Sequence, residues 1–398
     1  METPASEKLS IAIVNDAVTD CIAGSFISTL RFAERLSARG HNVIFIAARS
    51  VEHPASDYHK NIRVYRFRSV LLPKTEGQIH LCFPKISELK KIFTDEKVTV
   101  VHVMIPTFSA VAALKASKSL GIPSVAHSHT QPENIFLHLP SFLPVTVLNR
   151  VFYLYLKWLY SKSDAIIFPS TFSKKRFSNF KTDARRQEVI TNGVDTTVFH
   201  PASATSFFEK FGLNRSQKHI LYLGRLHPEK SVDTLLRAVP LILQKAPNTH
   251  FLIAGFGHLR QELERIAANL EVSKNITFCG KLSDEDVVHA YNASDIYVLP
   301  SLAELEGMTV LEAMACGKPI LIANAPESAA RYFVDGNGLL FEPENAADLA
   351  AKAITLLTDT ELLSCSAARS LSKSHEYDIR QSVLRLEALY LSLRRAHD

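Results

Sequence analysis

The chain has 398 residues, of which 46% are hydrophobic and 21% are charged; its length exceeds what one hydrophobic core usually supports, so we expect two domains. Five scattered cysteines form no C-x-x-C pair, which argues against a structural zinc site and indicates a reducing compartment. The polar N-terminus and the absence of an apolar run of about 18 residues predict neither a secretory signal nor a membrane span, so we expect a cytoplasmic protein.

The net charge of +5 is unevenly distributed along the chain. Residues 1–197 carry 25 Lys and Arg against 16 Asp and Glu, whereas residues 198–398 carry 20 against 24. The basic first half suggests a domain that meets an anionic surface. Chance variation along the sequence is the alternative explanation.

In the first half, short apolar runs alternate with helical patterns. Strands are predicted at 11–16, 43–49 and 98–106, and again at 123–129 and 164–170. A helix is predicted from Ser25 to Arg39, with Gly40 as its C-cap, and another over 108–121. This alternation predicts a parallel, doubly wound sheet.

The same alternation restarts after residue 201. Strands are predicted near 219–225, 250–257, 275–280, 294–300 and 319–324, each followed by a loop or helix. The fold class is therefore α/β, with two doubly wound Rossmann-like domains facing across a cleft, at residues 1–197 and 198–376. The last stretch, 377–398, reads as an amphipathic helix outside both repeats.

Two basic residues follow the first strand of the second domain, in GRLHPEKS (Gly224 to Ser231). Arg225 leaves the strand and Lys230 stands where the next helix begins. Two cations beside backbone amides and a positive helix terminus suit a diphosphate. A surface loop with two solvated bases is the alternative.

Three glutamates lie where a later strand gives way to a helix, in SLAELEGMTVLEAMACGKP (Ser301 to Pro319). Gly307 allows close backbone approach, and the amides of Met308 and Thr309 open the helix toward an anion. Carboxylates repel a phosphate but accept hydrogen bonds from a vicinal diol, so Glu304 and Glu312 suit sugar hydroxyls. Diphosphate and sugar together describe a nucleotide sugar; otherwise the two glutamates are a loop charge and a helix former.

These segments resemble family 4 retaining glycosyltransferases of the GT-B fold. The resemblance rests on GRLHPEK, GFGHLRQEL, ITNGVD and the E-x7-E spacing from Glu304 to Glu312, and it covers essentially the whole chain in order. It implies that the last helix, 377–398, packs back on the N-terminal, acceptor-binding domain.

The resemblance also implies roles for individual residues. Arg225 and Lys230 would grip the donor diphosphate, Glu304 would hold the donor sugar, and Glu312 the ribose. His129, in HSHTQPEN, would lie against the reacting sugar. The other positions expected in the nucleotide-sugar site are Gly24, Gly255, Leu282, Gly307, Met308 and Thr309, and those expected near the acceptor are Asp16 and Gln131.

The sequence departs from the family pattern in two loops. Leu305 stands where the family commonly has the first glycine of E-G-F-G, whereas Gly307 keeps the second. Ala23-Gly24 replaces the pair of glycines that often stands in the first loop. The first loop therefore has one glycine fewer than the family pattern for close approach to the donor phosphates.

Three other motifs mimic functional sites. Asp284-Glu285-Asp286 looks like a D-x-D metal motif, but Ser283 as N-cap and Asp286 three residues later explain it as a helix start. His127 and His129 share a strand face without an evident third metal ligand. Gly255-Phe256-Gly257 lacks the third glycine of a dinucleotide fingerprint, which argues against a dehydrogenase.

The resemblance and the residues together predict a mechanism without a metal or other cofactor. Arg225, Lys230 and the helix-start amides would stabilise the charge that grows on the leaving diphosphate. No carboxylate is placed as a nucleophile on the opposite face of the sugar. Retention would then follow a same-face displacement in which the departing phosphate oxygen takes the acceptor proton.

The acceptor is predicted from Phe142 to Tyr160, a segment with six aromatics interrupted by Arg150 and Lys157. Such a segment suits a membrane interface, with the bases near anionic headgroups; a buried helix is the alternative. Other basic residues add to the charge of this domain, namely the KKRF segment that begins at Lys174 and the arginines Arg63, Arg66 and Arg68. HTQPEN and IANAPESAARYF resemble bacterial enzymes that glucosylate diacylglycerol or sterols, which favours UDP-glucose, a lipid or glycolipid acceptor and peripheral contact with the inner face of the membrane.

Other classes remain open at this point. A glycosyltransferase with a soluble glycan or small-molecule acceptor would not depend on a lipid surface. A nucleotide-sugar epimerase of the same fold would convert the donor without any acceptor, and a sugar-binding module would never turn it over. Nucleic acid is disfavoured as a partner because the bases lack a recognition motif.

Overall fold

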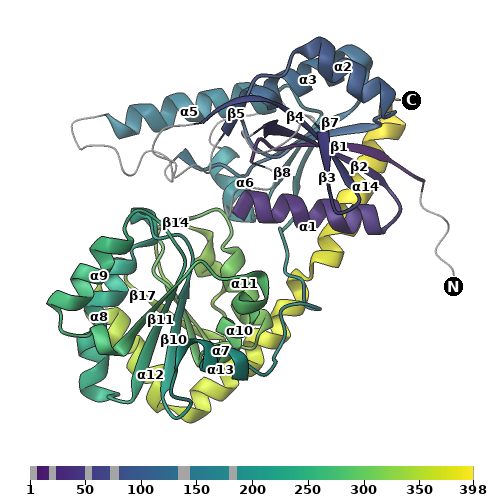
Figure 1. Cartoon of the computed structure of the whole chain (residues 1–398). Coiled ribbons are helices and arrows are strands. Elements are labelled where there is room, and N and C mark those ends of the chain that lie inside the picture. Colours follow the sequence, from purple (N-terminus) through teal and green to yellow (C-terminus); the bar gives the residue numbers. More distant parts are fainter. Residues whose placement is uncertain are drawn as a thin grey trace, which may run out of the picture. The chain divides into compact units, whose positions relative to one another are not determined.

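The computed structural model describes residues 7–17, 24–49, 56–71, 80–132, 144–178 and 186–397, which group into two compact units (Figure 1). The first unit takes in the described parts of Met1–Pro132, Ser141–Asn192 and Arg380–Asp398, and the second takes in Gly193–Ile379. The chain therefore leaves the first unit after Asn192 and returns to it at Arg380.

The first unit is built on a nine-stranded sheet. Its seven parallel strands are β1 (Ser10–Val14), β2 (Asn42–Arg49), β4 (Ile62–Leu71), β6 (Val100–Val103), β7 (Ser124–His127), β8 (Ala165–Phe168) and β9 (Arg186–Val189). They lie in the order β4-β2-β1-β6-β7-β8-β9, and β3 (Ser56–His59) and β5 (His80–Cys82) pair antiparallel with β4. Most central strands are continuous apolar runs buried on both faces, as parallel sheets require.

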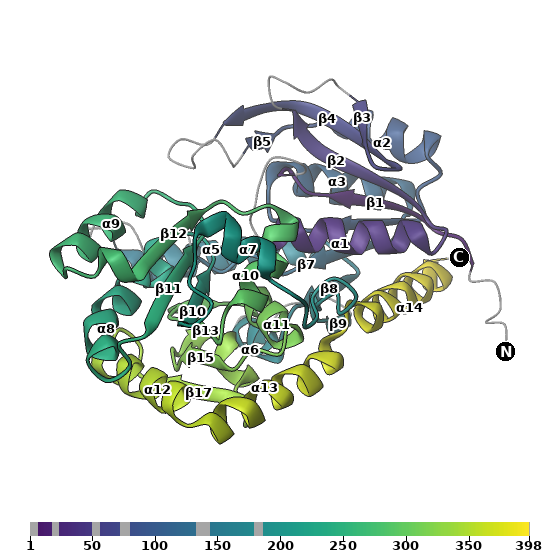
Figure 2. The ribbon, with the colours of Figure 1, turned by 60° about the horizontal axis from the view of Figure 1, so that its bottom comes forward.

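Helices cover both faces of this sheet. They are α1 (Gly24–Ala38), α2 (Ile86–Asp95), α3 (Phe108–Leu120), α5 (Val145–Tyr160), α6 (Thr171–Ser178) and α14 (Ile379–His397). Figures 1 and 2 show α2 and α3 on one face, and α1 and α14 on the other. Glu387 of α14 accepts bonds from Arg39 and from His41, which directly follow α1, and Arg186 of β9 donates to Ser392.

The second unit repeats the same design with a six-stranded, all-parallel sheet. Its strands are β10 (Lys218–Leu223), β11 (Thr249–Ala254), β12 (Ile276–Gly280), β13 (Ile296–Leu299), β15 (Ile320–Ala323) and β17 (Gly338–Phe341), in the order β12-β11-β10-β13-β15-β17. A separate pair joins β14 (Ala303–Glu304) to β16 (Glu327–Ser328). When the first six parallel strands of each unit are numbered along the chain, their order across the sheet is 3-2-1-4-5-6, the doubly wound order.

The helices of the second unit form two layers, with α8 packed against α9 and α12 on one side, and α7 with α10 and α11 with α13 on the other. Their bounds are α7 (Thr205–Phe211), α8 (Val232–Lys245), α9 (Arg260–Asn269), α10 (Asp284–Ala293), α11 (Met308–Ala315), α12 (Ala346–Thr358) and α13 (Thr360–Ser374). Short 3-10 turns complete it at Pro228–Lys230, Ser273–Asn275, Ala329–Phe333 and His375–Tyr377.

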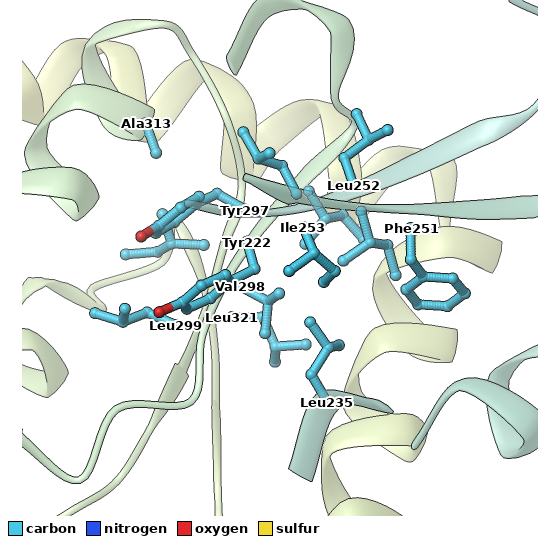
Figure 3. Close-up of a cluster of buried hydrophobic side chains, with 14 of the residues drawn as sticks. Tyr222, Leu235, Phe251, Leu252, Ile253, Tyr297, Val298, Leu299, Ala313 and Leu321 are labelled. Atoms are coloured by element: carbon cyan, nitrogen blue, oxygen red, sulfur yellow. The ribbon is translucent and has the colours of Figure 1, made fainter. Parts of the chain in front are cut away.

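Two tyrosines are buried in the hydrophobic core of the second unit (Figure 3). Tyr222 of β10 and Tyr297 of β13 are fully buried beside Leu235, Phe251 and Val298. Figure 3 shows their hydroxyl groups turned to the same side, away from Phe251. Burying two phenols requires partners for their hydroxyls, and these partners lie in the loops described below.

The α/β class with two doubly wound units is confirmed, but several strands are absent from the sequence prediction, namely β3, β4, β5, β9 and β17 and the short pair β14 and β16. Strand β4 carries Arg63, Arg66 and Arg68, which the sequence analysis counted only toward the basic charge of this domain. In the structure Arg66 is buried and ion-paired with Asp57 at 3.0 Å, so it adds nothing to a basic surface. Within the described ranges, every helix is too short or too polar to cross a membrane.

Candidate active site

The predicted donor residues meet at the point where the strand order of the second sheet reverses. Strands β10 and β13 are neighbours at the centre of this sheet. The strands that follow β10 in the chain, β11 and β12, lie on one side of this pair, and those that follow β13, β15 and β17, lie on the other. Arg225 to Lys230 directly follow β10, and Glu304 to Gly307 follow β13 after a short turn. Ligands of open α/β sheets bind at such a reversal, outside the carboxyl ends of the strands.

Arg225 is held by a carboxylate that the sequence analysis did not single out. Glu229 Oε1 accepts a hydrogen bond from Arg225 Nη2 at 2.9 Å, and the Glu229 side chain is 1% exposed against 33% for Arg225. The Tyr222 hydroxyl donates to the Arg225 carbonyl at 2.7 Å. The buried Glu229 carboxylate thus holds the Arg225 guanidinium on one side, while part of the guanidinium faces solvent.

Glu229 also joins the two loops of the site. Its backbone carbonyl accepts bonds from the amide of Leu302 at 2.8 Å and from the Ser301 hydroxyl at 3.2 Å. The turn after β10 is therefore bonded to the turn after β13. These hydrogen bonds fix the positions of the two loops relative to each other, so that no bound donor is needed to hold them together.

Lys230 and Glu304, which were predicted to bind different parts of a donor, contact each other. Lys230 Nζ lies 2.5 Å from Glu304 Oε1, and their side chains are 12% and 15% exposed. The sequence analysis assigned Glu304 to sugar hydroxyls and did not predict its contact with Lys230. The structure holds the carboxylate against the lysine.

Helix α11 begins at Gly307, whose φ of +105° is in the left-handed region. A Cβ at this glycine would lie 3.1 Å from the Ala330 side chain. Tyr297 donates to Thr309 Oγ1 at 2.7 Å, so a buried phenol fixes the first turn of the helix. The Met308 and Thr309 amides lie in that first turn, where helix amides lack partners within the helix.

Glu312 is almost fully buried, one helix turn beyond Thr309. Tyr291 of α10 donates to Glu312 Oε2 at 3.0 Å and to the Thr309 carbonyl at 3.1 Å. Burial and the neighbouring carboxylate raise the pKa of the Tyr291 hydroxyl well above its usual range. This hydroxyl therefore stays protonated and keeps donating to Glu312 at neutral pH.

Gly255 and Gly257 support the Arg225 loop at very close range. A Cβ at Gly255 would lie 1.8 Å from the Gly224 carbonyl oxygen, and one at Gly257 would lie 2.3 Å from the Leu226 carbonyl oxygen. The Leu226 amide donates to the Phe256 carbonyl at 2.8 Å. The glycine pair is thus explained by backbone packing, and Leu282 follows the neighbouring strand β12 as a half-buried side chain.

The remaining predicted residues belong to the first unit, where the reversal lies between β1 and β6. Asp16 follows β1 and is buried. It accepts bonds from the Ser109 hydroxyl and, at 3.1 Å, from the Cys82 amide. Burial raises the pKa of the Asp16 carboxyl, although these hydrogen bonds oppose the shift.

His129 belongs to a column of three imidazoles, His102, His127 and His129. The ring centres of His127 and His129 lie 4.0 Å apart, and those of His102 and His127 lie 5.4 Å apart, both pairs stacked. His102 Nδ1 lies 2.6 Å from the Tyr390 hydroxyl of α14. Burial lowers the pKa of His102 and of His129 to about 3, so both are neutral at pH 7.

Two further predicted residues lie in this unit. Gly24 is exposed at the first position of α1, and Ala23 before it lies outside the described residues. Gln131 is buried just after His129. Their roles toward donor and acceptor stay predictions.

The motifs that mimic metal sites have structural explanations. Ser283 caps α10 by accepting from the Asp286 amide at 3.1 Å, as predicted, and Asp286 pairs with Lys210 at 2.6 Å. The rings of His127 and His129 stack instead of converging on a point. Among the described residues, no group of three or more His, Cys, Asp or Glu could hold a metal ion.

Sequence matches to known families cover most of the chain. Residues 22–198 match Glycosyltransferase Family 4, and residues 203–370 match the glycosyl transferases group 1. The boundary between the two matches falls near the crossing from the first unit to the second, between Asn192 and Gly193.

Individual relatives have low identity over long stretches. The sulfoquinovosyl transferase SQD2 of Arabidopsis thaliana is 26% identical over 76% of this chain, and the match spans 57% of its own length. The alpha-monoglucosyldiacylglycerol synthase of Streptococcus pneumoniae is 22% identical over 80% of this chain and 72% of its own. A GDP-mannose-dependent alpha-mannosyltransferase of Mycolicibacterium smegmatis is 27% identical over 80% of each chain.

Solved structures share the fold over nearly the full length. Sucrose-phosphate synthase of Thermosynechococcus elongatus has a TM-score of 0.82 and 19% identity over 98% of this chain and all of the other. HepE of Anabaena, solved with UDP and glucose, has a TM-score of 0.75 and 20% identity over 96% of this chain and 99% of its own.

Proposed function

This chain belongs to the GT-B glycosyltransferases, and on that premise we propose that it is a retaining hexosyltransferase. The proposed donor is a nucleotide sugar, with UDP-glucose first among the candidates, and the proposed acceptor is a hydroxyl of a membrane lipid or glycolipid. The observation that carries the proposal is the set of cations, helix-start amides and carboxylates at the reversal of the second sheet.

In the proposed reaction Arg225, Lys230 and the first amides of α11 bind the donor diphosphate. Preorganised donors aimed at the oxygen that gains charge lower the barrier to its departure. Glu304 accepts bonds from the sugar hydroxyls and Glu312 from the ribose. Because this cation set can carry the developing charge, the mechanism that we propose uses no metal.

His129 supplies a neutral imidazole to the sugar. Its lowered pKa means that it exchanges hydrogen bonds with hydroxyls at neutral pH and carries no charge. No carboxylate is assigned as a nucleophile. The proposed retention of configuration therefore follows a same-face displacement, in which a diphosphate oxygen takes the proton from the acceptor hydroxyl.

The lipid acceptor is supported by helix α5, which has two different apolar faces. Its buried face carries Tyr153, Leu156, Leu159 and Tyr160. A second apolar stripe, at helical spacing, is exposed at Val147 (55%), Val151 (58%), Leu154 (52%) and Trp158 (45%). The two alternatives for this segment, core helix or interface helix, thus describe opposite faces of one helix.

Basic side chains accompany this exposed stripe. Arg150 is exposed on the same helix, and Lys162 Nζ lies 5.6 Å from the centre of the Trp158 ring. An apolar stripe with bases beside it suits the boundary between headgroups and acyl chains of an anionic membrane. The relative named as an alpha-monoglucosyldiacylglycerol synthase is consistent with such an acceptor.

The test is transfer of labelled sugar from UDP-glucose, UDP-galactose, UDP-GlcNAc and GDP-mannose, with and without anionic liposomes that contain diacylglycerol and sterol. We expect label in the organic phase only when liposomes are present. Label that stays in the aqueous phase with every donor would reject the lipid acceptor and favour a soluble glycan or small molecule. Conversion of the donor without any acceptor would favour an epimerase.

The membrane contact has its own control. Val151→Glu with Trp158→Glu should reduce sedimentation with anionic liposomes at least about fivefold, since two charges would replace the apolar stripe. Leu384→Glu, at an exposed apolar residue (42%) of α14, is the matched control and should bind as the unchanged protein does. Equal binding of all three proteins would reject α5 as the contact.

A further inference from the structure

The two cations of the donor site are already paired with carboxylates before any nucleotide binds. Arg225 contacts Glu229 at 2.9 Å, and Lys230 contacts Glu304 at 2.5 Å. A diphosphate therefore meets a site whose positive charges are already paired. Something in that site has to change partner for the diphosphate to bind well.

The two carboxylates differ in their freedom to do so. Glu229 lies in the same short turn as Lys230, is buried, and has its backbone bonded to Ser301 and Leu302. Glu304 is 15% exposed and lies on the two-residue strand β14, across from the lysine. Glu229 therefore stays with Arg225, and Glu304 is the group able to leave.

We propose that the Lys230–Glu304 pair makes the site select an intact nucleotide sugar over the free nucleoside diphosphate. This inference rests on the proposed function, because Glu304 must be the group that receives the donor sugar. A nucleotide sugar takes Lys230 with its phosphates and offers hydroxyl groups to Glu304. A nucleoside diphosphate takes Lys230 and leaves the carboxylate without a replacement.

Specificity of this kind comes from an unpaired group left by the wrong ligand. After transfer, the sugar is gone and only the nucleoside diphosphate remains. Glu304 then competes again for Lys230 and weakens the hold on the product. The pair thus favours entry of the donor and release of the product with the same two side chains.

The experiment measures dissociation constants of UDP and UDP-glucose, with GDP and GDP-mannose in parallel, by calorimetry at one salt concentration. Glu304→Gln keeps the shape of the side chain and one acceptor oxygen, but it replaces the other oxygen with an NH2 donor and cannot neutralise Lys230. We expect it to bind the free diphosphate roughly three- to tenfold more tightly, in the range of a partly exposed ion pair. Binding of the nucleotide sugar should gain less or become weaker.

A double-mutant cycle separates the pair from a general change in charge. Lys230→Met should weaken binding of the diphosphate, and Glu304→Gln should then add no gain. Asp286→Asn removes an equal charge from the surface pair with Lys210 in the same unit and should leave both constants unchanged. Glu304→Ala serves as a second variant, and thermal unfolding verifies that each variant is folded.

Three results would overturn the inference. Unchanged or weaker binding of the diphosphate by Glu304→Gln would remove the competition, and an equal gain for diphosphate and nucleotide sugar would remove the selection. A gain that persists with Lys230→Met would assign the effect to another partner. If neither nucleotide binds the unchanged protein or Glu304→Gln, the proposed donor class falls with it.

Discussion

The two units reverse their strand order in the same way, yet they place opposite chemistry at the reversal. In the second unit, Arg225, Lys230 and Glu304 gather there as charged groups, and Arg225 is one-third exposed. In the first unit, Asp16 is buried against Ser109, and the imidazoles His102, His127 and His129 of the strands β6 and β7 and the loop after β7 stack in neutral form. One topology thus carries paired charged side chains in one unit and buried imidazoles in the other.

The difference shows which parts of each site the fold determines. Strand order brings the carboxyl ends of two neighbouring strands together in both units. The residues that follow those strands determine charge and burial. Variants of the charged residues in the second unit should therefore lose mainly activity, whereas variants of the buried residues His102, His127 and Tyr390 in the first unit should lose mainly stability.

The largest expected effect is on the charged reversal. Arg225→Ala and Lys230→Ala should each lower the transfer rate at least about a hundredfold, because each removes a cation from the leaving diphosphate. Steady-state transfer from the best donor is the measurement. Normal rates in either variant, with thermal unfolding near that of the unchanged protein, would remove this region from the active site.

Lowering the pH should reduce the stability of the first unit, because its buried imidazoles resist protonation. The pKa of His102 and of His129 is about 3 in the folded chain, against 6.5 ordinarily. The unfolded chain therefore binds protons first, and stability falls as the pH falls from about 6.5 toward 3. From pH 7.5 to 5 each imidazole should cost about 2 kcal/mol in unfolding free energy, measured by urea denaturation.

The raised pKa of Asp16 acts in the opposite direction and reduces the net loss at low pH. His127→Phe isolates the imidazoles, since it keeps a flat ring in the column and removes one group that titrates. Its loss of stability on acidification should be smaller than in the unchanged protein. An equal loss would place the acid sensitivity elsewhere in the chain.

A smaller effect is expected at the far end of the imidazole column. Tyr390→Phe removes the hydroxyl that bonds His102 at 2.6 Å and leaves a buried ring nitrogen without this partner. The unfolding free energy should fall by about 1–2 kcal/mol. Tyr377→Phe, at a half-buried tyrosine of the second unit, is a comparison in which we expect a smaller change.

The smallest effect is expected at the acidic motif of α10. Asp286→Asn should change unfolding free energy by less than about 1 kcal/mol, because its partner Lys210 is 55% exposed, although the Asp286 side chain is only 15% exposed. Transfer should be unchanged, whether or not a divalent metal chelator is present. A loss of transfer would restore the motif as a functional one.

The fold could be predicted because its signals are local. Apolar runs followed by stretches with helical periodicity recur along both units. The motifs that resemble the family stand in the order that the family has them. Strand β4 escaped prediction because its buried positions include Arg66, whose partner Asp57 lies on another strand. The sequence pattern of that strand is therefore polar although its environment is not.

The candidate site could be predicted only as a set of residue types. Arg225, Lys230, Glu304 and Glu312 follow from charge, spacing and resemblance. Glu229 was passed over, although it stands in the same motif, because only the structure places its carboxylate on Arg225. The tyrosines that anchor Thr309 and Glu312 lie on other elements, so no spacing in the sequence connects them to the site.

The return of α14 to the first unit has a consequence for the order in which the protein is made. Residues 193–379 are contiguous, so the second unit has all of its strands before α14 has been translated. The first unit, although its sheet is synthesised earlier, lacks the partner of His102 and the carboxylate that bonds Arg39 and His41 until residues 387 and 390 emerge from the ribosome. Domains usually fold from the N-terminus onward; in this chain the last contacts of the first unit can form only after the whole of residues 193–379 has been synthesised.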